Sequence, residues 1–235
     1  MPLVWGGRTP IYAAMRPDSE IEFGGHPEMA LLARSWTANN EDRNALDTPR
    51  FVSLILNIKQ VLRDGIAGDF AELGVYKGNS AAILRHFAEV GGRTVFLFDT
   101  FEGFDRADLA GRDSEKPVEF GDTSLDAVRQ VAGTACAQFI KGRFPGSIPS
   151  EVYERRFAIV HLDCDLYEPT RAALDFFYPR LSSGGMLILH DYGGVYWDGI
   201  QRAVDDFLRL TGERLVLLPD KSGTAIVRKS ARMSL

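Results

Sequence analysis

Three absences narrow the functions open to this chain of 235 residues. It has only two cysteines, Cys136 and Cys164, and neither lies in a Cys-x-x-Cys pair or a Cys/His cluster, which excludes a disulfide framework and predicts a reduced, cytoplasmic location. It has no excess of basic residues: 27 Lys and Arg against 32 Asp and Glu give a net charge of -5, which argues against nucleic acid as a partner. No apolar run approaches the roughly 20 residues that span a bilayer, so we expect no membrane partner.

Two nucleotide-binding fingerprints are also missing. The turn after the first predicted strand reads ELGVYKGNS, which departs from Gly-x-Gly-x-x-Gly and lacks the Gly-Lys-Ser/Thr ending of a phosphate loop. The first departure argues against a nicotinamide-dependent oxidoreductase, the rival enzyme on this kind of sheet. The second argues against a nucleoside triphosphate site.

What is present is an alternation of strands and helices. Short apolar runs rich in Val, Ile, Leu and Phe alternate with helical segments, as they do where crossover helices connect parallel strands. The pattern predicts one α/β domain built on a doubly wound, mostly parallel seven-stranded sheet. The predicted parallel strands are 69–75, 94–100, 137–142, 157–164 and 185–191, and the helices between them are 79–90, 124–132, 168–178 and 198–211.

The two ends of the chain complete this architecture. Residues 214–219 and 224–229 flank a run of turn residues, which predicts an antiparallel hairpin at one edge of the sheet. Residues 50–63 have apolar side chains at helical spacing, and a short helix is predicted over 27–36. We expect residues 1–49 to form an N-terminal helical cap or lid and residues 50–235 to form the main domain.

The end of the first predicted strand has features of a ligand-binding turn. Gly74 and Gly78 permit a tight turn and a close approach of ligand to backbone, and the helix that follows offers free N–H groups. Glu72 would attract a cationic amino group and repel a pyrophosphate. Ser80, at the start of the helix, can donate a hydrogen bond to a carboxylate, although helix capping is an equally good explanation of a serine there.

The end of the second predicted strand indicates what the ligand is. Asp99, followed by Thr100, stands where an acidic residue can accept both hydroxyls of a ribose. Tyr76 and Phe144 could cover an adenine ring or a sulfonium, although such aromatic residues often only pack. A ribose site beside an acidic, cation-attracting turn favours an adenosine compound with a positive tail, and S-adenosylmethionine fits that description.

Acidic residues gather at the ends of the fourth and fifth predicted strands. Asp163 and Asp165 are two residues apart, so on an extended backbone both would face one cleft, where they need a cation or a shared proton between them. His190 and Asp191 close the neighbouring strand at the same edge. An EF-hand is excluded because Leu174 occupies the position of its bidentate glutamate. Cys164 should point to the opposite side as a small buried residue.

Five segments in this order resemble the macrocin O-methyltransferase family: GDFAELGVYKGNSA, FDTFEGF, KGRFPGSIP, VHLDCDLYEPTRAALDFFYPRLSSGG and DYGGVYWDG. The resemblance covers about residues 50 to 228. It implies a class I, S-adenosylmethionine-dependent and usually magnesium-dependent O-methyltransferase that acts on sugars in antibiotic biosynthesis. It also implies that Asp163 and the acidic pair ending the fifth strand hold the metal and that Asp165 is the general base.

The chain departs from the family where Asp-Asp-Tyr is usual and His190-Asp191-Tyr192 stands instead. In one outcome a divalent ion is retained by Asp163, Asp191 and water or His190, and a nitrogen ligand shifts preference from magnesium toward manganese, iron, cobalt or zinc. In the other outcome the ion is lost and His190 is itself the base.

The acceptor is expected to be a small hydroxylated molecule, and family analogy points to a glycosylated natural product. Aromatic residues are concentrated near the supposed acceptor side, and the polar segment 106–123 would form a lid or a ligand-ordered loop. A non-catalytic module that only binds S-adenosylmethionine is the alternative from another class, and a homo-oligomer is possible. The aromatic residues are Tyr167, Tyr192, Tyr196 and Trp197.

Overall fold

The computed structural model of the chain describes residues 27–45 and 47–230. The part of the expected N-terminal cap formed by residues 1–26 and residue 46 therefore lies outside the described residues. Within them, no helix has the length and apolar character needed to cross a lipid bilayer.

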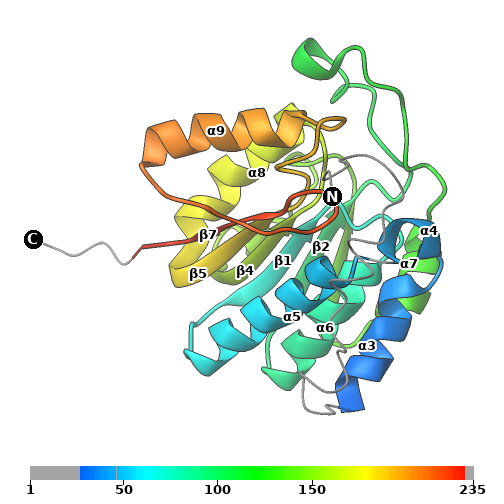
Figure 1. Cartoon of the computed structure of the whole chain (residues 1–235), viewed down its shortest axis with the longest axis vertical. Coiled ribbons are helices and arrows are strands. Elements are labelled where there is room, and N and C mark those ends of the chain that lie inside the picture. Colours follow the sequence, from blue (N-terminus) through cyan, green and yellow to red (C-terminus); the bar gives the residue numbers. More distant parts are fainter. Residues whose placement is uncertain (1–26, 46, 231–235) are drawn as a thin grey trace, which may run out of the picture.

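A seven-stranded sheet runs through the molecule (Figure 1). Its strands are β1 (Asp69–Leu73), β2 (Val95–Asp99), β3 (Ala137–Lys141), β4 (Phe157–Leu162), β5 (Leu181–Leu189), β6 (Val216–Leu217) and β7 (Ala225–Arg228). Their order is β3-β2-β1-β4-β5-β7-β6. The pairs among β1 to β5 are parallel, whereas β7 is antiparallel to both β5 and β6. The predicted doubly wound sheet with a terminal hairpin is confirmed.

Helices cover both faces of this sheet (Figure 1). On one side of the sheet lie α5 (Thr48–Arg63) and α6 (Asn79–Val90), with α3 (Pro27–Thr37) and α7 (Leu125–Ala132) packed on α6. On the other side lie α8 (Tyr167–Arg180) and, packed on it, α9 (Gly199–Thr211). A short helix, α4 (Glu41–Asn44), joins α3 to α5. The remaining helical pieces are 3₁₀ turns at Gly111–Asp113 and Ser150–Val152.

The strands bury side chains on both faces, which explains their near-continuous apolar sequences. In β2, Val95 and Leu97 belong to the core under α5 and α6, whereas Phe96 and Phe98 belong to the core under α8. All four side chains are fully buried. Successive side chains of β2 therefore still point to opposite faces of the sheet. Both sets are apolar because helices cover both faces.

Most elements differ from their predicted bounds by one or two residues at an end, and the strand predicted over 185–191 begins four residues earlier, at Leu181. The strand predicted over 157–164 ends at Leu162, the hairpin strand predicted over 214–219 is reduced to Val216–Leu217, and α4 was not predicted. Apolar content indicates where a strand lies but does not show where its neighbour stops pairing with it. A single four-residue helical turn leaves no periodic pattern to find.

Candidate active site

One cavity lies at the carboxyl ends of β1, β2, β4 and β5, on both sides of the point between β1 and β4 where the strand order reverses. Ligands of open α/β sheets bind at such a point. The cavity has a volume of about 450 Å³. The predicted site residues that line it are Gly74, Tyr76, Asp99, Thr100, Phe144, Asp163, Asp165, His190 and Asp191.

Gly74 allows the first strand to end directly against the fourth. Its φ is 86°, and a β-carbon at this position would lie only 2.0 Å from the carbonyl oxygen of Asp163. The amide of Asp163 in turn donates a hydrogen bond to the carbonyl oxygen of Leu73 at 2.9 Å. The glycine turn and the acidic strand end are therefore held together by backbone contacts.

Asp99 holds the turn after β1 and the end of β2 in one arrangement. One of its carboxylate oxygens accepts hydrogen bonds from the amides of Val75 at 2.6 Å and Tyr76 at 2.9 Å. The other oxygen accepts one from the amide of Phe101 at 2.6 Å. Asp99 thus lines the cavity as predicted. Its carboxylate also fixes the backbone of the neighbouring turns by accepting hydrogen bonds from three amides.

The structure does not bring Glu72, Gly78 or Ser80 to the cavity wall. Glu72 is fully buried on the face of β1 that α5 covers, and its carboxylate lies 2.8 Å from Nδ1 of His161 on β4. Gly78 precedes α6 with a φ of 83° and packs against Val128, and Ser80 is buried in the first turn of α6. Strand alternation turns Glu72 away from the strand-end site.

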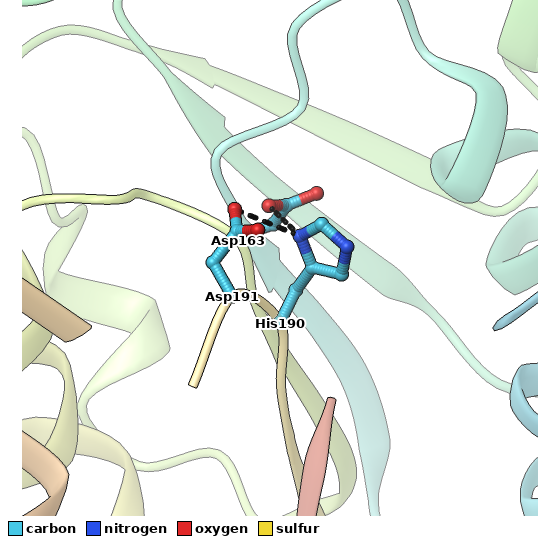
Figure 2. Close-up of side chains that lie close together, drawn as sticks. All are labelled: Asp163, His190 and Asp191. Atoms are coloured by element: carbon cyan, nitrogen blue, oxygen red, sulfur yellow. Dashed lines mark hydrogen bonds and ion pairs between the residues drawn. The ribbon is translucent and has the colours of Figure 1, made fainter. Parts of the chain in front are cut away.

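Asp163, His190 and Asp191 form a compact cluster at the ends of β4 and β5 (Figure 2). Nδ1 of His190 lies 2.8 Å from a carboxylate oxygen of Asp163 and 3.0 Å from one of Asp191. The second oxygen of Asp163 accepts a hydrogen bond from Nη2 of Arg50 at 2.5 Å. The imidazole nitrogen thus bridges Asp163 and Asp191, whereas the sequence predicted a cation or a shared proton between Asp163 and Asp165.

The pKa values in this cluster are shifted in opposite directions. Burial and Arg50 alone would lower the pKa of His190, but Asp163 and Asp191 raise it to about 10. Burial alone would raise the pKa of Asp163, but His190 and Arg50 hold it well below its usual range. At neutral pH the cluster therefore contains a protonated imidazole between ionised carboxylates.

Asp165 reaches the cavity by a different route from the one predicted. Because β4 ends at Leu162 and Asp165 has a φ of 62°, the backbone turns here and strand alternation does not place the side chain. Burial, together with the charges of Asp191 and Asp163, raises the pKa of Asp165 well above its usual range, and its side chain shares a hydrogen bond with Asp191. Cys164 is buried as predicted, with its sulfur 3.3 Å from the hydroxyl of Thr170, but it belongs to the same cavity lining as Asp163 and Asp165.

The donor set of the cluster fits a divalent ion. Asp163, His190 and Asp191 each offer one ligand atom, and these atoms all lie within 4.8 Å of one another. The other ring nitrogen of His190, Nε2, is buried and has no hydrogen-bond partner among residues 27–45 and 47–230. Two carboxylates and one imidazole suit manganese, iron, cobalt or zinc better than they suit magnesium.

An aromatic rim surrounds the opening of the cavity. Phe120 contacts Tyr76 with ring centroids 5.1 Å apart and Phe104 at 5.0 Å, and Phe104 contacts Trp197 at 5.2 Å. Tyr196, which is 55% exposed, packs on Trp197 at 4.8 Å. Of the four predicted acceptor-side aromatics, Tyr196 and Trp197 line the cavity, whereas Tyr167 and Tyr192 donate hydrogen bonds to Asp206 and Asp205 of α9.

The segment 106–123, predicted as a lid or an ordered loop, is anchored at several points, among them a hydrogen bond from the hydroxyl of Tyr76 to Asp122 at 2.7 Å. Arg143 donates two hydrogen bonds to Asp108, at 2.9 and 2.7 Å. The buried carboxylate of Asp113 accepts a hydrogen bond from the amide of Tyr167 at 2.7 Å. Lys116 forms an ion pair with Asp198, which precedes α9. These contacts hold the segment against the strand ends.

Sequence reasoning missed the basic residues of the site. Arg43 and Arg50 both line the cavity, and the guanidinium of Arg43 lies 4.5 Å from the centroid of the Phe120 ring. Arg50 stands in the first turn of an amphipathic helix, where an arginine is ordinarily taken for a solvent-exposed residue. Only the packing of α5 against the strand ends shows that its side chain turns inward.

Comparison with known proteins identifies the family. A family model described as macrocin-O-methyltransferase (TylF) matches residues 45–214. The 8-demethyl-8-(2,3-dimethoxy-alpha-L-rhamnosyl)-tetracenomycin-C 4'-O-methyltransferase of Streptomyces olivaceus is 31% identical over 207 residues, which cover 81% of this chain and 77% of that protein. Demethyldecarbamoylnovobiocin O-methyltransferase of Streptomyces niveus is 26% identical over 184 residues, which cover 70% of this chain and 67% of that protein.

Solved structures agree on the fold. The O-methyltransferase NovP has a TM-score of 0.66 at 22% identity and covers 78% of this chain and 80% of its own. The calicheamicin methyltransferase CalS11 has a TM-score of 0.61 at 22% identity and covers 87% of this chain and 92% of its own. With the family match spanning most of its length, the chain belongs to the macrocin O-methyltransferase family and is an S-adenosylmethionine-dependent O-methyltransferase.

Proposed function

We propose that this enzyme methylates a hydroxyl group on the sugar of a glycosylated natural-product intermediate. The names of its relatives support a sugar-bearing antibiotic precursor as acceptor. The observation that carries the proposal is that Asp163, Asp165, His190 and Asp191 line the same cavity as the Gly74 turn and Asp99. The methyl donor and the acceptor hydroxyl would then be bound in the same cavity, beside the carboxylates that can accept the hydroxyl proton.

We assign the methyl donor to the ends of β1 and β2. The backbone at Gly74 carries no side chain that would keep the ligand away, and Asp99 and Thr100 line the cavity beside it. The acidic lining attracts a sulfonium cation. Phe144 contributes a wall, because its ring is 4% exposed and stacks on Phe177. Glu72, Gly78 and Ser80 act indirectly, by building the strand and the helix start.

Asp165 is the proposed general base. It is buried beside Asp191 and lines the cavity, and its raised pKa means that it keeps its proton to higher pH than an exposed carboxyl group does. Any positive charge that enters the cavity, the sulfonium included, lowers that pKa and makes the carboxylate available. A base that ionises when the methyl donor arrives suits the removal of a hydroxyl proton during transfer.

Asp163, His190 and Asp191 are the proposed ligands of a divalent ion. When bound there, the ion supplies a Lewis acid that lowers the pKa of an acceptor hydroxyl. His190 would have to give up its ring proton to serve as a ligand, because metal-bound imidazole is neutral. Binding of the ion is therefore expected to release a proton.

A metal-independent reaction with His190 as the base is the second candidate. The two carboxylates that flank His190 argue against it, because Asp163 and Asp191 raise its pKa to about 10 and so favour the protonated imidazole, which cannot accept a proton. A module that binds S-adenosylmethionine without catalysis is the third. The cytoplasmic location and a possible homo-oligomer stay predictions.

A methyl-transfer assay separates these candidates. Purified enzyme is incubated with S-adenosylmethionine and a panel of rhamnosylated and other glycosylated polyketides and aminocoumarins, and products are followed by mass spectrometry. We expect methylated glycoside, loss of activity after exhaustive chelation, and recovery with manganese. Activity that survives chelation but disappears in His190→Ala would select the metal-independent reaction. Tight binding of S-adenosylhomocysteine without transfer to any acceptor would select the binding module.

A further inference from the structure

Arg50 is a largely buried cation beside Asp163 of the acidic cluster, although it belongs to a helix outside the strand-end loops. It is the third residue of α5, and its side chain is 12% exposed. Its guanidinium carbon lies 5.2 Å from the ring centroid of Trp36 on α3. Its Nε has no hydrogen-bond partner among the described residues, so the contacts with Trp36 and Asp163 are what fix the group.

The contact with Arg50 determines how Asp163 presents its carboxylate. One oxygen of Asp163 accepts the hydrogen bond from Nη2 of Arg50, and the other faces Nδ1 of His190. The two oxygens are thus held by donors from two different parts of the chain, α5 and the turn that follows β5. Asp163 can offer a cation only the oxygen that points toward His190 and Asp191, so it serves as a ligand through one atom.

The charge of Arg50 also changes what the cluster attracts. A guanidinium stays protonated at any physiological pH, so Arg50 brings a permanent positive charge. It lies close enough to Asp47, Asp163 and Asp191 to interact with all three. The affinity of a carboxylate site for a divalent cation depends on the number of ligand charges. A fixed cation beside Asp163 therefore weakens the attraction for a second cation.

We propose that Arg50 is a positioning residue that turns Asp163 toward the acceptor side of the cavity and limits the affinity of the cluster for a divalent ion. The inference rests on the proposed function, because it treats Asp163, His190 and Asp191 as the ion's ligands. Arg50 acts through Asp163, with which it forms an ion pair at 2.5 Å. The role of Arg50 is to hold Asp163 so that it binds the divalent ion through one oxygen atom, and to keep the affinity for that ion low enough for the ion to exchange.

The test compares Arg50→Gln with Arg50→Lys and with Arg63→Gln, a control that removes the same charge from the exposed far end of the same helix. Calorimetric titration with Mn²⁺ measures ion affinity, and titration with S-adenosylhomocysteine checks that the site is intact.

We expect Arg50→Gln to bind Mn²⁺ about tenfold more tightly than wild type and to lose about tenfold in kcat, since changes to residues that hydrogen-bond a metal ligand have effects of this size. Arg50→Lys should keep the Mn²⁺ affinity of the wild type but lose kcat, because lysine retains the charge without the planar fork. Arg63→Gln should match wild type.

Tighter ion binding is the outcome that a merely structural role for Arg50 would not produce, because a loosened site binds the ion more weakly. Weaker or unchanged Mn²⁺ affinity in Arg50→Gln, including no Mn²⁺ binding in either protein, overturns the proposal. So does an unchanged kcat in Arg50→Gln. A wild-type enzyme that methylates no acceptor in the panel instead overturns the proposed function, and the Mn²⁺ titration still decides the effect of Arg50 on the ion.

Discussion

At the scale of single residues, Gly74 shows how a turn can depend on the absence of a side chain. A β-carbon there meets the backbone of the neighbouring strand end, and backbone cannot move aside as a flexible side chain can. Gly92 has a similar backbone conformation, with a φ of 62°, but a β-carbon there would have no heavy atom within 4 Å. An alanine at Gly92 would therefore lose stability only because of the left-handed backbone conformation. An alanine at Gly74 would lose stability because of that conformation and because its β-carbon collides with Asp163.

We therefore expect Gly74→Ala to destabilise the protein much more than Gly92→Ala. The left-handed conformation alone costs a non-glycine residue about 1 to 2 kcal/mol, which is the loss expected for Gly92→Ala. Gly74→Ala should lose more than about 4 kcal/mol and also S-adenosylhomocysteine binding, because the collision displaces the end of β4. Urea unfolding measures both variants, and equal losses would contradict the assigned contact.

Asp165 offers a prediction about chemistry at the same scale. In Asp165→Asn the amide replaces a carboxyl group whose pKa burial raises well above its usual range and which hydrogen-bonds Asp191, so folding should change little. We expect kcat to fall by about two to four orders of magnitude, the usual contribution of a general base, with unchanged affinity for S-adenosylhomocysteine. Steady-state kinetics and calorimetry measure the two quantities. An asparagine variant that turns over at the wild-type rate would rule out Asp165 as the base.

At the scale of elements, the segment before α5 is tied to the start of α6. The side-chain amide of Asn79, the first residue of α6, donates hydrogen bonds to the carbonyl oxygens of Ser35 at 2.8 Å and Ala38 at 2.6 Å. Trp36 and Asn44 are joined by two further hydrogen bonds between α3 and α4. These links fix α3 against α6, the helix that follows the turn at Gly74.

Asn79→Ala should therefore loosen α3 and α4 specifically. Losing two buried hydrogen bonds should cost about 1 to 3 kcal/mol, and amide hydrogen exchange over residues 31–45 should become faster. Ser124→Ala is the matched variant: it removes the cap of α7, where the serine hydroxyl accepts a hydrogen bond from the amide of Ala127. Exchange over residues 31–45 that accelerates equally in both variants would show that general destabilisation is the cause.

The elements also show what sequence can and cannot predict. The parallel strands and crossover helices are predictable, because their apolar runs have the period and length that burial on two faces requires. Asp163, His190 and Asp191 are predictable as a cluster, because parallel strands end at one edge. Arg50 is not, since its inward direction depends on how α5 packs, and the burial of Glu72 depends on the face that strand register assigns to it.

At the scale of the whole molecule, the buried cluster makes stability depend on pH. The pKa of His190 is about 10 in the folded protein against an ordinary value of 6.5. A group whose pKa is raised by folding stabilises the folded state fully below its unfolded pKa, and this contribution is lost as the pH rises through the folded pKa. The loss should therefore fall between about pH 6.5 and 10.

We expect the free energy of unfolding of the metal-free protein to decrease across this range and to decrease less in His190→Gln. Urea unfolding in the presence of a chelator, measured at intervals from neutral to alkaline pH, gives the two slopes. Asp165, whose pKa is also raised, contributes in the same direction in both proteins. Identical slopes would mean that His190 is not the group that titrates.

The hydrogen bond from the amide of Tyr167 to Asp113 links distant parts of the chain. Leu166, which precedes α8, has no side chain that can cap the helix, so a carboxylate from the segment after β2 performs that task. If this segment swings outward to admit a bulky glycoside, the first amide of α8 loses its partner two residues beyond Asp165. Entry of the acceptor and the position of Asp165, the proposed base, would then be linked through the first turn of α8.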